Sequence, residues 1–139
     1  METITIFTAG EAKGNPGPAA IAVRILDTSG QLLKEVAESI GNATSNFAEY
    51  QAVLRGLQVA EEYFGDKTKE LQFELKLDGE LVKKQLNGEV QIKEPGFVPY
   101  FIEIHNLRVA SFVNLKFKQI SPEKNQITKK LATELLDRK

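Results

Sequence analysis

The chain has 139 residues, of which 42% are hydrophobic and 27% charged, and its formal net charge is −1. This length and balance are typical of one folded domain, which we expect to span residues 1–139, and they exclude a disordered chain and a generally basic, histone-like one. Because cysteine is absent, disulfides, cysteine nucleophiles and cysteine-ligated zinc are excluded as well.

Neither a membrane segment nor an export signal is expected. No apolar run approaches the length of a membrane span. The N-terminus also lacks a basic segment followed by an apolar one. The lack of cysteine is compatible with a reducing compartment. We therefore expect a cytoplasmic protein without a membrane partner, and a monomer.

Hydrophobic periodicity predicts the elements of the first half of the chain. In order, we expect a strand over 3–8, a loop rich in glycine and proline over 10–18, strands over 19–28 and 31–40 with a turn at Ser29-Gly30, and a helix from Thr44 or Ser45 to about Phe64. The helix has a capping hydroxyl at its start and Gly65 at its end, which are typical boundaries.

The second half alternates strands and helices. In order, we expect a strand over 70–78, a short helix over 80–86, a helix over 97–111, a strand over 113–120 and a helix over 123–136. A helical crossover between the first and fourth strands makes them parallel. The pattern predicts an α/β fold, a mixed five-stranded sheet with helices on both faces.

Two carboxylates are expected at one edge of this sheet. In an open α/β sheet, ligands bind beyond the carboxyl ends of the parallel strands. The first strand ends at this edge, and Asp78 lies there at the end of the fourth strand. Glu49, one turn into the first helix, can point at the same edge. Alone, Asp78 is equally well interpreted as a helix cap and Glu49 as a first-turn acid. The glycine-rich loop alone is better interpreted as a plain turn, since it matches no phosphate-loop fingerprint.

Four ordered blocks make these features specific. They read F-T-A-G-E-A-K-G-N-P-G-P-A, G-N-A-T-S-N-F-A-E-Y-Q-A-V, L-D-G-E-L-V-K-K-Q-L-N-G and E-K-N-Q-I-T-K-K-L-A. Over almost the full chain they resemble the type 1 ribonuclease H family. The resemblance implies a sheet of order 3-2-1-4-5 with strand 2 antiparallel, and hydrolysis of the RNA strand of RNA/DNA hybrids with two Mg²⁺ ions.

The resemblance also implies four catalytic acids, and this chain retains two of them. The retained acids are Glu49 and Asp78, which are the candidate metal ligands. Ala9 stands where the family has the aspartate that ends the first strand, and Lys129 stands where it has the acid of the last helix. Gly79 replaces a usual serine, and Pro122 occupies a position that often holds arginine.

These substitutions bear on the chemistry rather than on the fold. Two-metal hydrolysis needs hard oxygen ligands around both Mg²⁺ ions, which Ala9 cannot supply. Lys129 adds a positive charge where a metal ligand is expected. Glu11 is a weaker candidate for a replacement acid, because a loop orients a side chain less well than a strand end does. We therefore expect Mg²⁺ to be weakly bound or absent.

We expect the chain to retain substrate-binding residues even though catalytic acids are replaced. By the resemblance, the residues that contact the hybrid are Gly10, Asn15, Gly17, Thr44, Ser45, Asn46 and Gln85. Short polar groups and backbone amides of this kind suit the wide minor groove of a hybrid. Lysines 83, 84 and 93 are candidates for phosphate contacts.

Two classes of function remain open on the sequence. The first is a ribonuclease H impaired by the changes at Ala9 and Lys129, whether these arose by engineering or by natural divergence. The second is a natural non-catalytic relative that binds nucleic acid or a protein partner. The expected partner in the first case is an RNA/DNA hybrid.

Overall fold

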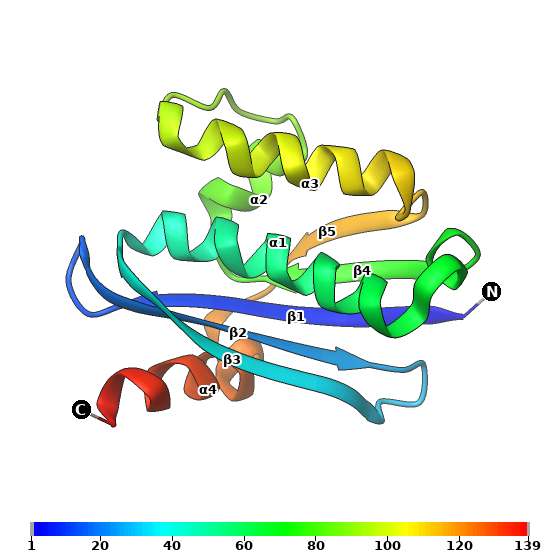
Figure 1. Cartoon of the computed structure of the whole chain (residues 1–139), viewed down its shortest axis with the longest axis horizontal. Helices are drawn as coiled ribbons and strands as arrows, with labels where there is room; N and C mark the ends of the chain where they lie inside the picture. The colour runs from blue at the N-terminus through cyan, green and yellow to red at the C-terminus, as the bar shows by residue number, and fades with distance from the viewer. Residues whose placement is uncertain (1, 139) are drawn as a thin grey trace.

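The structure is a computed structural model that describes residues 2–138. Figure 1 shows its elements along the chain. The strands are β1 (Thr3–Ala12), β2 (Gly17–Leu26), β3 (Leu32–Ala43), β4 (Gln72–Leu77) and β5 (Leu115–Gln119). The helices are α1 (Ser45–Phe64), α2 (Glu80–Leu86), α3 (Val98–Ala110) and α4 (Gln126–Asp137), and the 3₁₀ turns η1 (Gly65–Lys69), η2 (Pro95–Phe97) and η3 (Pro122–Asn125) precede β4, α3 and α4.

The strands form one five-stranded sheet of order β3-β2-β1-β4-β5. β2 is antiparallel to both β1 and β3, whereas β1, β4 and β5 run parallel. The predicted fold class and strand order are therefore confirmed. The parallel direction of β1 and β4 brings their carboxyl ends to the same edge, where the candidate acids are expected.

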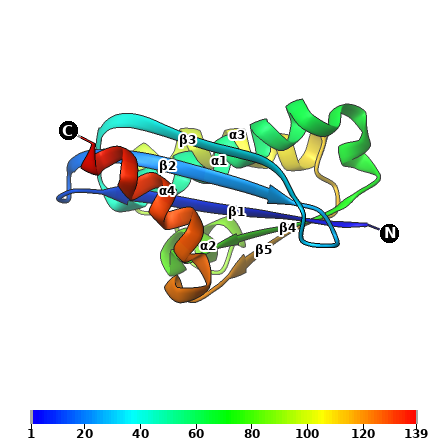
Figure 2. The same cartoon turned by 90° about the horizontal axis from the view of Figure 1, so that it is seen from below.

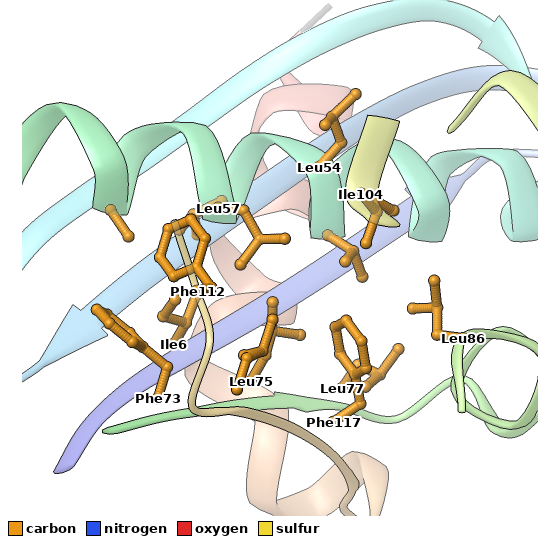
Figure 3. Packing of buried hydrophobic residues seen from close by; sticks show 14 of the residues in the cluster. Ile6, Leu54, Leu57, Phe73, Leu75, Leu77, Leu86, Ile104, Phe112 and Phe117 are labelled. Atoms are coloured by element: carbon orange, nitrogen blue, oxygen red, sulfur yellow. The ribbon is translucent and has the colours of Figure 1, made fainter. Parts of the chain in front are cut away.

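Helices cover the two faces unequally. Figure 1 shows α1, α2 and α3 on one face of the sheet and α4 alone on the other. The main core lies between α1, α3 and the sheet, and Figure 3 shows how side chains such as Leu57, Leu75 and Phe112 meet there. A smaller cluster on the opposite face joins β2 to α4. Most of the hydrophobic stabilisation therefore comes from the α1 face.

The first strand is longer than predicted. The prediction that it ends at Thr8 is wrong, because β1 continues to pair with β2 as far as the partners Ala12 and Ala19. Lys13 closes the ladder by donating from its backbone amide to the carbonyl of Pro18. Glu11 therefore lies on a strand rather than in a loop, and it shares a face of β1 with Ala9.

Other boundaries differ by a few residues. The strand predicted over 113–120 is shorter, and the last helix begins at Gln126 because η3 occupies its expected first turn. The prediction for α1 is confirmed at both ends. Thr44 accepts a hydrogen bond from the backbone amide of Phe47, and Gly65 ends the helix with a positive φ of 58°.

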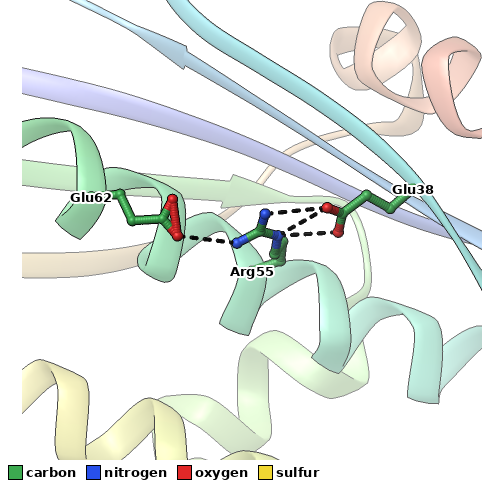
Figure 4. A network of polar contacts seen from close by, with 3 residues as sticks. All are labelled: Glu38, Arg55 and Glu62. Atoms are coloured by element: carbon green, nitrogen blue, oxygen red, sulfur yellow. Dashed lines mark hydrogen bonds and ion pairs between the residues drawn. The ribbon is translucent and has the colours of Figure 1, made fainter.

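An ion pair joins α1 to the edge strand β3. Figure 4 shows the Arg55 guanidinium between Glu38 of β3 and Glu62 of α1. The Arg55 Nε lies 3.1 Å from one Glu38 oxygen, and the side chains are 30% and 40% exposed. Exposed pairs of this kind contribute about 1 kcal/mol or less, so the contact orients β3 more than it stabilises the fold. Among the described residues, no helix is long and apolar enough to cross a bilayer.

Candidate functional site

The sheet edge brings three carboxylates and one ammonium together. Asp78 follows β4, Glu49 lies in the second turn of α1, and Glu11 lies near the end of β1. Lys129 reaches them from α4. Its Nζ lies 3.8 Å from Asp78 Oδ2 and 3.9 Å from Glu11 Oε1. The ammonium therefore bridges an acid of β1 and the acid that follows β4.

Glu49 is the most deeply buried of the acids. Glu49 is only 7% exposed, and its Oε2 has no hydrogen-bond partner within the described residues. Burial, and then the charges of Asp78 and Glu11, raise the pKa of the Glu49 carboxyl to about 8. The Gly10 amide and Lys129 oppose this shift but do not cancel it. The buried environment of Glu49 therefore favours its protonated form.

Asn125 positions Asp78. Its Nδ2 donates to the carbonyl of Thr8 at 2.9 Å and to Asp78 Oδ2 at 3.2 Å, and the residue is 1% exposed. These two bonds join η3 to Thr8 of β1 and to the residue that follows β4. Sequence analysis predicts no role for Asn125. Its place in the fourth block, E-K-N-Q-I-T-K-K-L-A, is the feature that could have identified it.

Ala9 and Glu11 lie on the α4 face of β1. Ala9 pairs across strands with Ala22, which packs against Ala132 of α4. Ala9 is 1% exposed and has no atom that can bind a metal ion. Burial raises the pKa of Glu11, Lys129 lowers it and Asp78 raises it. Glu11 thus belongs to the same electrostatic cluster, which its expected loop position did not predict.

Four of the predicted substrate residues line one groove. It has a volume of about 1040 Å³ and lies between the N-terminus of α1, α2 and the segment 90–97. Asn15, Thr44, Asn46 and Gln85 contribute to its walls, together with Lys84 and Lys93. Ser45 lies beside the groove, where its backbone amide donates to Asn15 Oδ1 at 3.1 Å. Phe47, Leu81 and Val90 were not anticipated; they supply apolar lining.

Gly10, Gly17 and the groove residue Gln85 are engaged in contacts within the protein. A Cβ at Gly10 would collide with the backbone of Ala48, so the glycine lets β1 approach α1 closely. Gly17 is buried against the Lys13 carbonyl at the turn into β2. Gln85 is 4% exposed; its Oε1 accepts from the Tyr50 hydroxyl at 2.6 Å, and its Nε2 donates to the Gln91 carbonyl. These three residues hold the walls of the site in place.

A sheet of this order, with acids at the shared ends of β1 and β4, defines a ribonuclease H-like protein. Residues 7–135 match the family model described as reverse transcriptase-like. LC11-RNase H1, isolated from compost by a metagenomic approach, is 39% identical with a TM-score of 0.93, over 99% of this chain and 98% of that one. The chain therefore belongs to the type 1 ribonuclease H family.

Two further comparisons bear on substrate and length. LC11-RNase H1 is also known in complex with an RNA/DNA hybrid, at 38% identity and a TM-score of 0.92 over 97% of both chains. Ribonuclease HI of Halobacterium salinarum is 31% identical over 92% of this chain. The chain spans 61% of that relative, and 35% of the bifunctional protein Rv2228c of Mycobacterium tuberculosis, to which it is 26% identical over 96% of its own length.

The residues present do not fit a pair of Mg²⁺ ions. Within residues 2–138, no group of three or more His, Cys, Asp or Glu side chains is placed to hold a metal ion. Mg²⁺ requires hard oxygen ligands, whereas the side chain of Ala9 offers none and the Lys129 ammonium lies 3.8 Å from Asp78 Oδ2. Among the described residues, the cation that lies between Glu11 and Asp78 is the ammonium of Lys129.

Proposed function

We propose that the chain is a ribonuclease H-family module that binds RNA/DNA hybrids and lacks the metal-dependent cleavage of the family. The observation that carries this proposal is the position of Lys129, within 4 Å of both Glu11 and Asp78. An ammonium there neutralises the carboxylates that would otherwise attract divalent ions. The substitution thus replaces the metal charge without replacing its chemistry.

Binding is supported by the groove. Asn15, Thr44 and Asn46 present short polar side chains, and Lys84 and Lys93 add cations within reach of phosphates. The Thr44 side-chain oxygen accepts the helix-capping bond from Phe47, which leaves its hydroxyl proton free to donate to a ligand. LC11-RNase H1, which has the same fold, is known in complex with an RNA/DNA hybrid. A hybrid is therefore the first ligand to test.

Loss of cleavage is supported by the donor set. Ala9 removes a ligand that the family places at the end of β1, and Glu49 would have to lose its proton before it could bind a metal ion. Glu11 does not compensate, because Lys129 already neutralises it. We also propose a cytoplasmic, monomeric single domain; light scattering after size exclusion tests the oligomeric state.

The test separates binding from cleavage. A labelled 18-base-pair RNA/DNA hybrid is incubated with the protein in Mg²⁺ or Mn²⁺, and its affinity is measured in parallel by fluorescence anisotropy. We expect binding that weakens with salt and an uncut RNA strand. The charge-matched variants Lys84→Gln/Lys93→Gln and Lys67→Gln/Lys69→Gln locate the ligand, since only the first pair lines the groove. Cleavage by the unmodified chain, or equal loss of affinity in both pairs, contradicts the proposal.

A further inference from the structure

α4 covers only part of its face of the sheet. Figure 2, which views the sheet from the α4 side, shows α4 in front of the C-terminal part of β1. No described helix lies in front of the N-terminal part of this strand. The burial of the β1 residues on this face shows where α4 stops covering the sheet. Thr3, Thr5 and Phe7 are half-buried, whereas Ala9 is fully buried. A region centred on Phe7 therefore stays open to solvent.

Basic side chains flank Phe7 on both neighbouring strands. Phe7 pairs with Arg24 of β2 and with Lys76 of β4, and cross-strand partners lie side by side on one face. The Arg24 guanidinium carbon lies 5.8 Å from the centre of the Phe7 ring, and Lys76 Nζ lies 5.7 Å from it. An aromatic ring thus sits between two cations on the central strand.

The row of cations continues to the sheet edge. Lys76 pairs with Lys118 of β5, and Lys116 of β5 pairs with Glu74. Lys118 bonds to Glu74 at 2.9 Å, and the lysines around Glu74 lower the pKa of its carboxyl. Lys76 and Lys116 have no ion-pair partner among residues 2–138.

The charge of this surface is therefore positive after its internal pairs are counted. Glu74 is matched by Lys118, and Glu35 lies 3.8 Å from Arg24 Nε. Arg24 Nε itself is buried and makes no hydrogen bond. With strands about 4.8 Å apart, the cations from β2 to β5 span roughly 14 Å. Such a row matches the phosphates of an extended strand better than it matches a small anion.

We propose that the basic sheet face, formed by Phe7, Arg24, Lys76, Lys116 and Lys118, binds single-stranded nucleic acid. The cations contact the phosphates, and Phe7 offers an aromatic contact to a base, a combination that recurs in sheet surfaces and grooves that bind single strands. A double-stranded ligand has no unpaired base to offer Phe7. This site is separate from the hybrid groove, which α1 and α2 form on the other face, so it does not depend on the proposed function.

The test uses a fluorescein-labelled dT12 oligonucleotide and the hybrid, each titrated with the full chain at several salt concentrations. The variant Lys76→Gln/Lys116→Gln should weaken dT12 binding by roughly tenfold or more in low salt. It should also lower the slope of log affinity against log salt by about 1.4, the value for two lost phosphate contacts on a single strand. Phe7→Leu, which keeps an apolar side chain on the face, should weaken dT12 binding roughly fivefold. Circular dichroism and the melting temperature verify that each variant is folded.

Two charge-matched controls make the result decisive. Lys67→Gln/Lys69→Gln, on η1, should leave dT12 binding within about twofold of the unmodified chain, and the groove variant Lys84→Gln/Lys93→Gln should weaken hybrid binding only. An equal loss in the η1 control would mean that only net charge matters. Loss of dT12 binding in the groove variant would place the single strand in the groove. Absence of dT12 binding, with or without binding of a poly-glutamate peptide, would also overturn the proposal; binding of that peptide would assign the face to an acidic protein.

Discussion

Gly79 provides the space in which the carboxyl of Glu49 lies. A Cβ on residue 79 would overlap Glu49 Oε2, so the glycine and the buried orientation of this acid occur together. The family resemblance implies serine at this position, and a serine side chain cannot coexist with Glu49 as it stands. The change at Gly79 is therefore coupled to the state of a retained acid, although the two residues come from different elements.

Replacing Gly79 by serine should release Glu49. The obstacle is the end of a flexible side chain rather than backbone, so we expect Glu49 to turn toward solvent at little cost in stability. Because burial is the largest cause of its raised pKa, the pKa of Glu49 should fall from about 8 toward its usual value. Carbon-detected NMR titration of the glutamate carboxyl groups measures this pKa in the variant and in the unmodified chain. An unchanged titration of Glu49 in a folded variant would contradict the steric coupling.

The buried acid also predicts how stability depends on pH. Glu49 has a pKa of about 8 in the folded chain and 4.5 as its model value, so the folded state holds a proton that the unfolded state has released between these limits. Its favourable contribution is complete below about pH 4.5 and is lost as pH rises through about 8, at no more than about 1.4 kcal/mol per pH unit. Glu49→Gln should flatten the decline of unfolding free energy between pH 5 and 8, measured by urea denaturation.

A matched substitution isolates this effect. Glu123→Gln removes a carboxyl group from an exposed position in η3, so its unfolding free energy should follow that of the unmodified chain across the same range. Parallel curves for Glu49→Gln and the unmodified chain would show that Glu49 does not hold its proton in the folded state.

Restoring the family acids should restore a metal site. Ala9→Asp with Lys129→Asp removes the bridging ammonium and adds two carboxylates, so we expect Mg²⁺-dependent cleavage of a hybrid, with less recovery in Ala9→Asp alone. Without metal the double variant should be less stable, since like charges crowd the site. Mg²⁺ at ten times its dissociation constant should then stabilise it by about 1.4 kcal/mol, while leaving the melting temperature of the unmodified chain almost unchanged.

The single variant Lys129→Met serves as the control for charge, because it removes the ammonium without adding an acid. It should lose stability by leaving Glu11 and Asp78 without their shared cation, and it should not cleave. If the double variant folds and binds hybrid but leaves the RNA strand intact in Mg²⁺ and Mn²⁺, then other changes, such as Gly79 and Pro122, have also dismantled the site.

The sequence by itself determined the order of elements and the retained acids. Periodicity and capping are local properties, so α1 could be predicted from Thr44 to Gly65, and the motifs around Glu49 and Asp78 were sufficient for the family and its strand order. They were not sufficient for the length of β1, because strand pairing with β2 continues through Gly10, a residue that looks like the start of a loop.

Only the tertiary structure decided the state of the site. The position of Lys129 between Glu11 and Asp78 requires that α4 pack against β1 and β2. The raised pKa of Glu49 depends on the water that neighbouring elements exclude. The open face around Phe7 likewise depends on where α4 ends its coverage. Burial and ion pairing depend on contacts between segments that are distant along the chain. The spacing of residues within one segment does not predict these contacts.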